Sequence, residues 1–231
     1  MVRILALGLL LLLEAGRAWA LDPRSEAALS SLLAELTNAP SRAEVRDFVL
    51  SPWAAAPSPK LWIGAALVAG ELRVGLFQEE EAGLRLIGRS TGVEPLGQAP
   101  LDDRMKVHLA LDLIPYRIRL NEVAFGVVVE SDLTMPGRHR VTKTLELYRY
   151  QSDVLSPIFA GVIERSHQEQ DLAQASNGAS AKEQGETRKF NILITHKETE
   201  GLFDLLLREE GSGKAVRYAW MGRGYGAVEG K

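Results

Sequence analysis

Strict alternation of apolar and polar side chains over residues 105–113 constrains this chain more than any other feature. The apolar members are Met105, Val107, Leu109, Leu111 and Leu113, and the residues between them are Lys106, His108, Ala110 and Asp112. A strand points successive side chains to opposite faces, whereas a helix repeats every 3.6 residues. The alternation therefore predicts a half-buried antiparallel strand.

Nine further segments predict strands by weaker alternation or by a short apolar run. They are 61–68, 72–76, 84–89, 125–129, 143–150, 154–164, 190–194, 203–207 and 216–220. Turn-forming residues such as Ala69-Gly70 and Gly211-Ser212-Gly213 separate them. We expect a mostly β fold, an antiparallel meander or sandwich of about ten strands with N-terminal helices packed on it. A closed propeller needs about sixteen strands, and that number is not found.

The first twenty residues predict an export signal. Arg3 precedes an apolar run over 4–13, and Ala18-Trp19-Ala20 provides small residues for cleavage after Ala20. The apolar run is too short to span a bilayer. We therefore expect a mature chain that begins at Leu21 and is periplasmic or secreted.

Helix signals follow in residues 21–60. Asp22-Pro23 is typical of an N-cap followed by proline at the first helical position, and Ser41 with Glu44 forms a capping box that predicts a second short helix through about Val49. We expect 21–60 to be a helical segment with a proline-rich connector and 61–231 to be one β domain. Residues 166–189, poor in large apolar side chains, predict a mobile surface loop in that domain.

Composition narrows the classes of partner. The chain contains no cysteine, which excludes disulfides, thiol catalysis and cysteine-bound zinc, and suits a bacterial exported protein that depends on its core. Without residues 1–20 the chain has a net charge of about −4, so neither nucleic acid nor anionic lipid is attracted in bulk. No second apolar run predicts a membrane span.

Motifs of catalysis or metal binding are weak. Gly88-Arg89-Ser90-Thr91-Gly92 matches a nucleophile elbow, but that motif requires a following helix, and Val93-Glu94-Pro95 does not begin one. The four histidines (His108, His139, His167 and His196) stand far apart without metal-ligand spacing, and no calcium loop occurs. We predict no catalytic residue, no metal and no cofactor.

The segment 131–141 is the best candidate binding site. It predicts a connection that carries Arg138, His139 and Arg140 after Pro136-Gly137. Clustered cations on a loop could hold an acidic partner or ligand by charge-assisted hydrogen bonds, although a solvated turn gives the same pattern.

Four segments, together with a faint repeat of hairpins, resemble a known group of proteins. The segments are 112–117, 122–127, 145–150 and 220–225, and the repeat pairs Leu76-Phe77 with Leu147-Tyr148. They are similar to uncharacterised exported bacterial proteins whose β-hairpin repeats look like propeller blades. The resemblance covers about residues 61–228 and implies no activity.

Two functions remain open. The first is a non-catalytic extracytoplasmic binding or interaction protein whose partner is an envelope protein or a cell-wall polymer. The alternative is a periplasmic hydrolase with a dispersed active site, drawn from Ser90, His108, His139, His196, Asp102 and Asp103.

Overall fold

The computed structural model describes residues 21–34, 44–54, 60–90, 105–170 and 183–228. These residues form one helix and twelve strands, so the predicted mostly β fold is confirmed. The elements are α1 (Pro23–Leu33), β1 (Val45–Pro52), β2 (Leu61–Val68), β3 (Glu71–Glu80), β4 (Gly83–Arg89), β5 (Met105–Arg119), β6 (Glu122–Met135), β7 (Arg138–Gln151), β8 (Val154–Gln170), β9 (Glu183–Thr199), β10 (Leu202–Glu209), β11 (Ala215–Trp220) and β12 (Tyr225–Val228).

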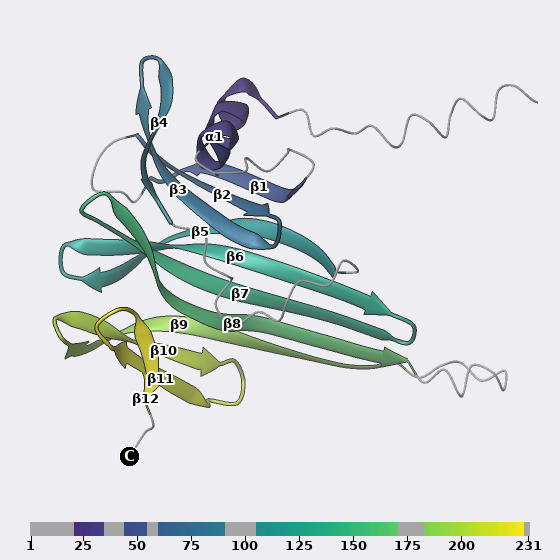
Figure 1. Cartoon of the computed structure of the whole chain (residues 1–231). Helices are drawn as coiled ribbons and strands as arrows, with labels where there is room; N and C mark the ends of the chain where they lie inside the picture. The colour runs from purple at the N-terminus through teal and green to yellow at the C-terminus, as the bar shows by residue number, and fades with distance from the viewer. Residues whose placement is uncertain (1–20, 35–43, 55–59, 91–104, 171–182, 229–231) are drawn as a thin grey trace, which may run out of the picture.

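The strands form two antiparallel meanders within one open sheet (Figure 1). β1 to β4 pair in sequence order, and so do β5 to β12. The two meanders join where β4 meets β8 in a short parallel contact between Arg89 and Val154. Tight hairpins make most of these connections, which is how antiparallel neighbours in sequence come to be neighbours in space.

Three buried clusters stack the chain into layers. One fills the space between β1–β4 and β5–β8, where the Trp53 ring meets Phe125 edge-on at 5.2 Å. A second lies where β9–β12 fold back on β5–β8, around Phe159 and Leu205. The third lies beneath α1 on the outer side of the first meander. Alternate residues of one strand can therefore belong to different cores, as expected when both faces of a sheet are covered.

Helix α1 begins as its sequence predicts. The Asp22 carboxylate accepts hydrogen bonds from the backbone amides of Arg24, at 3.0 Å, and Ser25, at 3.2 Å. These bonds satisfy amides that have no partner within the helix. Leu29 and Leu32 are buried against the first meander, in the cluster that contains Phe77.

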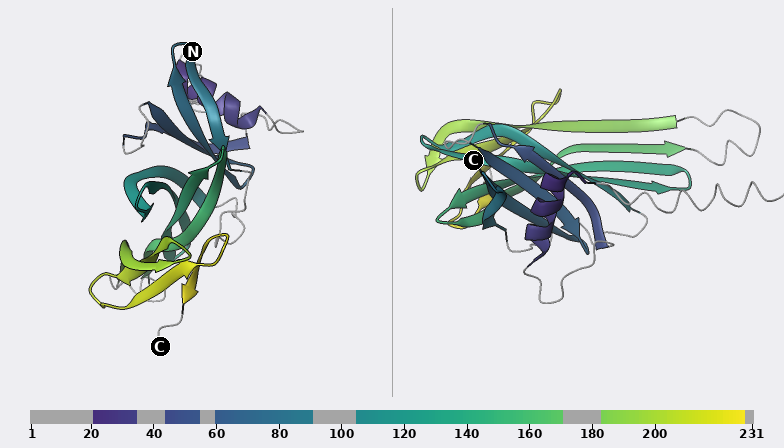
Figure 2. Two further views of the ribbon diagram at one scale, coloured as in Figure 1. Left: turned by 90° about the vertical axis from the view of Figure 1, so that its left-hand side faces the viewer. Right: turned by 90° about the horizontal axis from the view of Figure 1, so that it is seen from above.

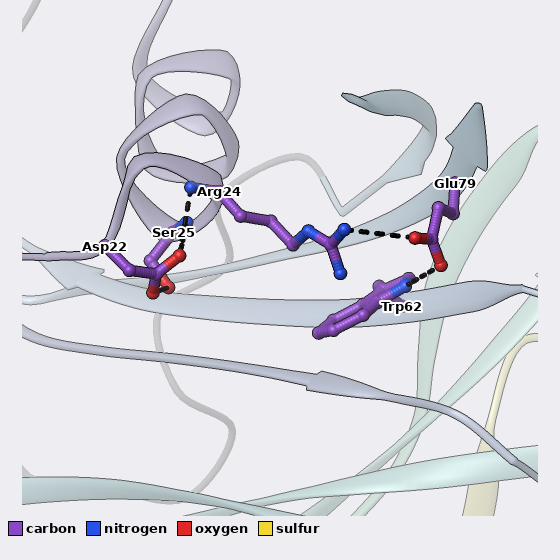
Figure 3. Close-up of polar contacts among 5 residues, drawn as sticks. All are labelled: Asp22, Arg24, Ser25, Trp62 and Glu79. Atoms are coloured by element: carbon purple, nitrogen blue, oxygen red, sulfur yellow. Dashed lines mark hydrogen bonds and ion pairs between the residues drawn. The ribbon is translucent and has the colours of Figure 1, made fainter. Parts of the chain in front are cut away.

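A polar clamp at the start of α1 fixes the helix to the sheet (Figure 3). The Arg24 guanidinium lies 4.8 Å from the centre of the Trp62 ring and 3.1 Å from the Glu79 carboxylate. The other oxygen of Glu79 accepts a hydrogen bond from the Trp62 indole at 3.1 Å. One carboxylate thus joins helix, β2 and β3.

The second predicted helix is wrong. Val45–Pro52 is strand β1, paired along its length with β2, and Ser41 of the capping box lies outside the described residues. The segment is rich in β-branched and aromatic side chains, and Phe48 is buried beneath α1. Pairing with β2 and burial of this face outweigh a local capping signal. β12 was not predicted either.

The paired far ends of β6 to β9 extend beyond the body of the molecule as a projection that we call the arm (Figures 1 and 2). The arm comprises residues 130–143, 164–170 and 183–189. The predicted connection over 131–141 is therefore a strand hairpin that turns at Pro136-Gly137. The predicted loop over 166–189 is strand at both of its ends, and residues 171–182 lie outside the described residues.

Candidate functional site

A pocket of about 290 Å³ opens between the two meanders. Its lining comes from both meanders: Trp53, Leu61, Gln78, Ile87, Asn121, Glu122, Val123 and Tyr150. Its walls are mostly apolar, with two side-chain amides and a carboxylate among them. This composition is typical of a small binding pocket, although the volume is at the low end for one.

Its ionisable groups are held by their neighbours. Glu122 forms a two-pronged ion pair with Arg149, in which the Arg149 Nη2 atom lies 3.1 Å from Oε2. The Tyr150 hydroxyl lies 2.8 Å from the Asp153 carboxylate and 3.2 Å from the Ile87 carbonyl. Burial, followed by the hydrogen bond to Asp153, raises the pKa of Tyr150. These contacts fix both side chains as parts of the wall.

The predicted site residues lie at the start of β7 and not in a loop. Arg138 and Arg140 share one face of the arm, whereas His139 points to the other face, because side chains alternate along a strand. The His139 Nε2 atom lies 2.8 Å from the Asp132 carboxylate. The structure therefore separates the predicted trio into two faces.

The face that carries His139 is balanced in charge. Across this face, directly opposed residues of β5 to β9 alternate between basic and acidic side chains: His108, Glu130, Lys143, Glu164 and Lys189. The Lys143 ammonium lies 3.3 Å from Glu130 and 3.7 Å from Glu164. Burial acts to lower the pKa of Lys143, but the bonds and charges of Glu130 and Glu164 outweigh it and raise that pKa. We call this row the charge ladder.

The opposite face of the arm carries an excess of arginine, and we call it the arginine face. It holds Arg138 and Arg140 on β7, Arg165 on β8 and Arg188 on β9. Arg165 is directly opposite Arg188 in the β8–β9 register. Arg140 is opposite His167, two residues along β8 from Arg165.

Carboxylates balance only part of the arginine face. Arg138 pairs with Glu169 at 2.9 Å, and Arg188 lies 2.7 Å from Glu186 and 3.9 Å from Glu209. The hydrogen bond and charge of Arg188 lower the pKa of Glu186. Within the described part of the chain, neither Arg140 nor Arg165 has an ion pair.

The residues considered for a hydrolase are dispersed. The Ser90 hydroxyl accepts a hydrogen bond from the Val74 amide at 3.0 Å and lies 3.4 Å from the Val74 carbonyl. Ser90 therefore links the end of β4 to β3. The histidines lie on β5 (His108), β7 (His139) and β9 (His196), while Asp102 and Asp103 lie outside the described residues. Among the residues with described positions, no cluster of three or more His, Asp or Glu could hold a metal ion.

Sequence reasoning found Arg138 and Arg140 but missed Arg165 and Arg188. Both missed arginines belong to strand segments, at or beside the predicted loop over 166–189. No local signal shows that they face each other, since this depends on the β8–β9 register.

Comparison with known proteins found no relative: no family model, no curated protein and no solved structure matches this chain. In the part of the chain that the structure describes, α1 is the only helix, and it is neither long nor apolar enough to cross a membrane.

Proposed function

We propose that this chain is a non-catalytic binding protein that works outside the cytoplasm, and that its arm contacts the partner. The export signal predicted from residues 1–20 supports the location. The partner class is an envelope protein or a cell-wall polymer. The arm carries the proposal because its order is not explained by the cores of the molecule.

The long strand segments of the arm are ordered although they bury little apolar surface. No described side chain of 130–143, 164–169 or 185–189 belongs to any of the three buried clusters. Fixing a residue's backbone costs about 1–2 kcal/mol, which burial in a core normally offsets. A highly charged sheet that extends from the body, with many of its side chains exposed, is suited to contact with another molecule.

Site-specific crosslinking tests this proposal. A photoreactive phenylalanine derivative replaces Thr134 or Thr187, which are exposed on the arm, and a control protein carries it at Ser212 in the β10–β11 turn. We expect light-dependent adducts from the arm positions in isolated envelopes and none from Ser212.

A second control position separates the arm from the pocket. Leu120, 69% exposed, precedes the pocket residue Asn121 in the β5–β6 turn. Adducts from Leu120 but from neither arm position would show that the contact lies at the pocket and would overturn the proposal. Equal adduct yields from Ser212 and the arm would do the same.

A further inference from the structure

We infer that Arg140 and Arg165, with Arg188 beside them, form a binding site for a phosphate group carried by the partner. The inference rests on the proposed function of the arm and names the chemistry that the arm recognises. It arises from the arrangement of charge on the arginine face.

The strand register places the three guanidinium groups close together. Arg165 and Arg188 are directly opposed, and such pairs have Cβ atoms about 4.5–5.5 Å apart. Arg140 is diagonal to Arg165, a relation in which Cα atoms lie about 7–8 Å apart. These separations are well within the length of arginine side chains, so the groups of three adjacent strands can meet around one anion.

This arrangement of like charges is unfavourable for the stability of the arm. Like charges directly opposite each other destabilise a sheet, and Arg165 has no carboxylate in ion-pair contact within the described residues. The same strands carry the charge ladder on their other face, where Lys143 stands between two glutamates. One face is therefore matched for stability, while on the other Arg140 and Arg165 have no ion pair among the described residues. A local conflict of this kind is expected at a binding site.

The free arginines suit phosphate better than carboxylate. Glu186 and Glu209 already pair with Arg188. The guanidinium groups of Arg140 and Arg165 have no ion pair among the described residues, so their paired N–H donors are available to a ligand. A single carboxylate has two oxygens and one charge, which one guanidinium satisfies. A phosphate monoester has three free oxygens and a charge of about −1.5 to −2, enough to bind both guanidinium groups. The terminal phosphate of a lipid such as phosphatidic acid and the terminal phosphate of a soluble polymer present the same oxyanion chemistry.

The test measures binding by the mature chain of three probes at low salt. The probes are a short linear inorganic polyphosphate, whose terminal groups carry three free oxygens, vesicles of phosphatidic acid in phosphatidylcholine, and polyglutamate. The variant is Arg140→Ala with Arg165→Ala. Its matched control is Arg208→Ala with Arg223→Ala, which removes two exposed arginines without ion pairs in the described structure, one on β10 and one in the β11–β12 turn.

We expect the Arg140/Arg165 variant to bind polyphosphate at least tenfold more weakly than the parent chain and the control pair to remain within about threefold. The thermal unfolding midpoint of Arg165→Ala should be no lower than that of the parent chain, because the substitution removes a like-charge pair. Binding to the vesicles with the same loss in the variant would identify a lipid source. Binding to polyphosphate alone would identify a soluble polymer.

Three results overturn the phosphate site: unchanged polyphosphate binding by the variant, polyglutamate binding as tight as polyphosphate binding, or a clear fall in the unfolding midpoint of Arg165→Ala. None of them affects the crosslinks from Thr134 and Thr187. If the phosphate test fails but the arm still gives crosslinks, the proposed function stands and only the inferred phosphate site is rejected.

Discussion

Glu79 should contribute measurably to stability where α1 meets β2 and β3. Its carboxylate accepts from the Trp62 indole at 3.1 Å and pairs with Arg24 at 3.1 Å (Figure 3). A hydrogen bond to a charged group contributes about 1.5–3 kcal/mol. The ion pair adds only about 0.2–1 kcal/mol, because both side chains are partly exposed.

Glu79→Ala removes both contacts and should lower the free energy of unfolding by about 2 kcal/mol. For a domain of this size that corresponds to a fall of about 4–8 °C in the unfolding midpoint. Glu79→Gln keeps an oxygen that accepts from the indole, but it loses the ion pair and turns the charged hydrogen bond into a weaker neutral one, so it should cost about 1 kcal/mol.

Urea unfolding followed by tryptophan fluorescence measures both variants. Glu80→Ala serves as the control, since among the described residues Glu80 pairs only with exposed Arg85, and the substitution should change stability by less than about 0.5 kcal/mol. If Glu79→Gln is as destabilising as Glu79→Ala, or if neither differs from Glu80→Ala, the hydrogen bond from the Trp62 indole contributes nothing measurable to stability, contrary to this prediction.

Two further predictions concern the layers. Asp47 on β1 accepts from the Leu109 amide of β5 at 2.6 Å, so Asp47→Ala should cost about 2–3 kcal/mol in urea unfolding and speed hydrogen exchange at Leu109; unchanged exchange would contradict this link between the meanders. Burial, followed by the charge of Asp204, raises the pKa of Tyr225, whose hydroxyl donates to the Phe203 carbonyl at 2.7 Å. A raised pKa gives stability that is complete below the unfolded value near pH 10 and is lost at higher pH, so Tyr225→Phe should flatten the alkaline decline of the unfolding free energy; parallel curves for the two proteins between pH 8 and 11.5 would refute this.

The sequence by itself determined where most strands lie and where the helix begins. Alternation over 105–113 identifies half of β5, and Asp22-Pro23 identifies the start of α1, because side-chain period and capping are local properties. The same local reasoning failed at Val45–Pro52, where pairing with β2 turned an expected helix into a strand. Propensity is a weak preference that contacts distant in sequence can reverse.

The candidate site shows the same division. Arg138 and Arg140 stand out in the sequence as a cationic cluster, but only the folded sheet sends His139 to the opposite face and brings Arg165 against Arg188. Which side chains meet across strands depends on register, and a shift of one residue would send every side chain to the other face. Register is set by the packing of the cores and the turns together, so the tertiary structure alone decided which charges are matched and which are left free.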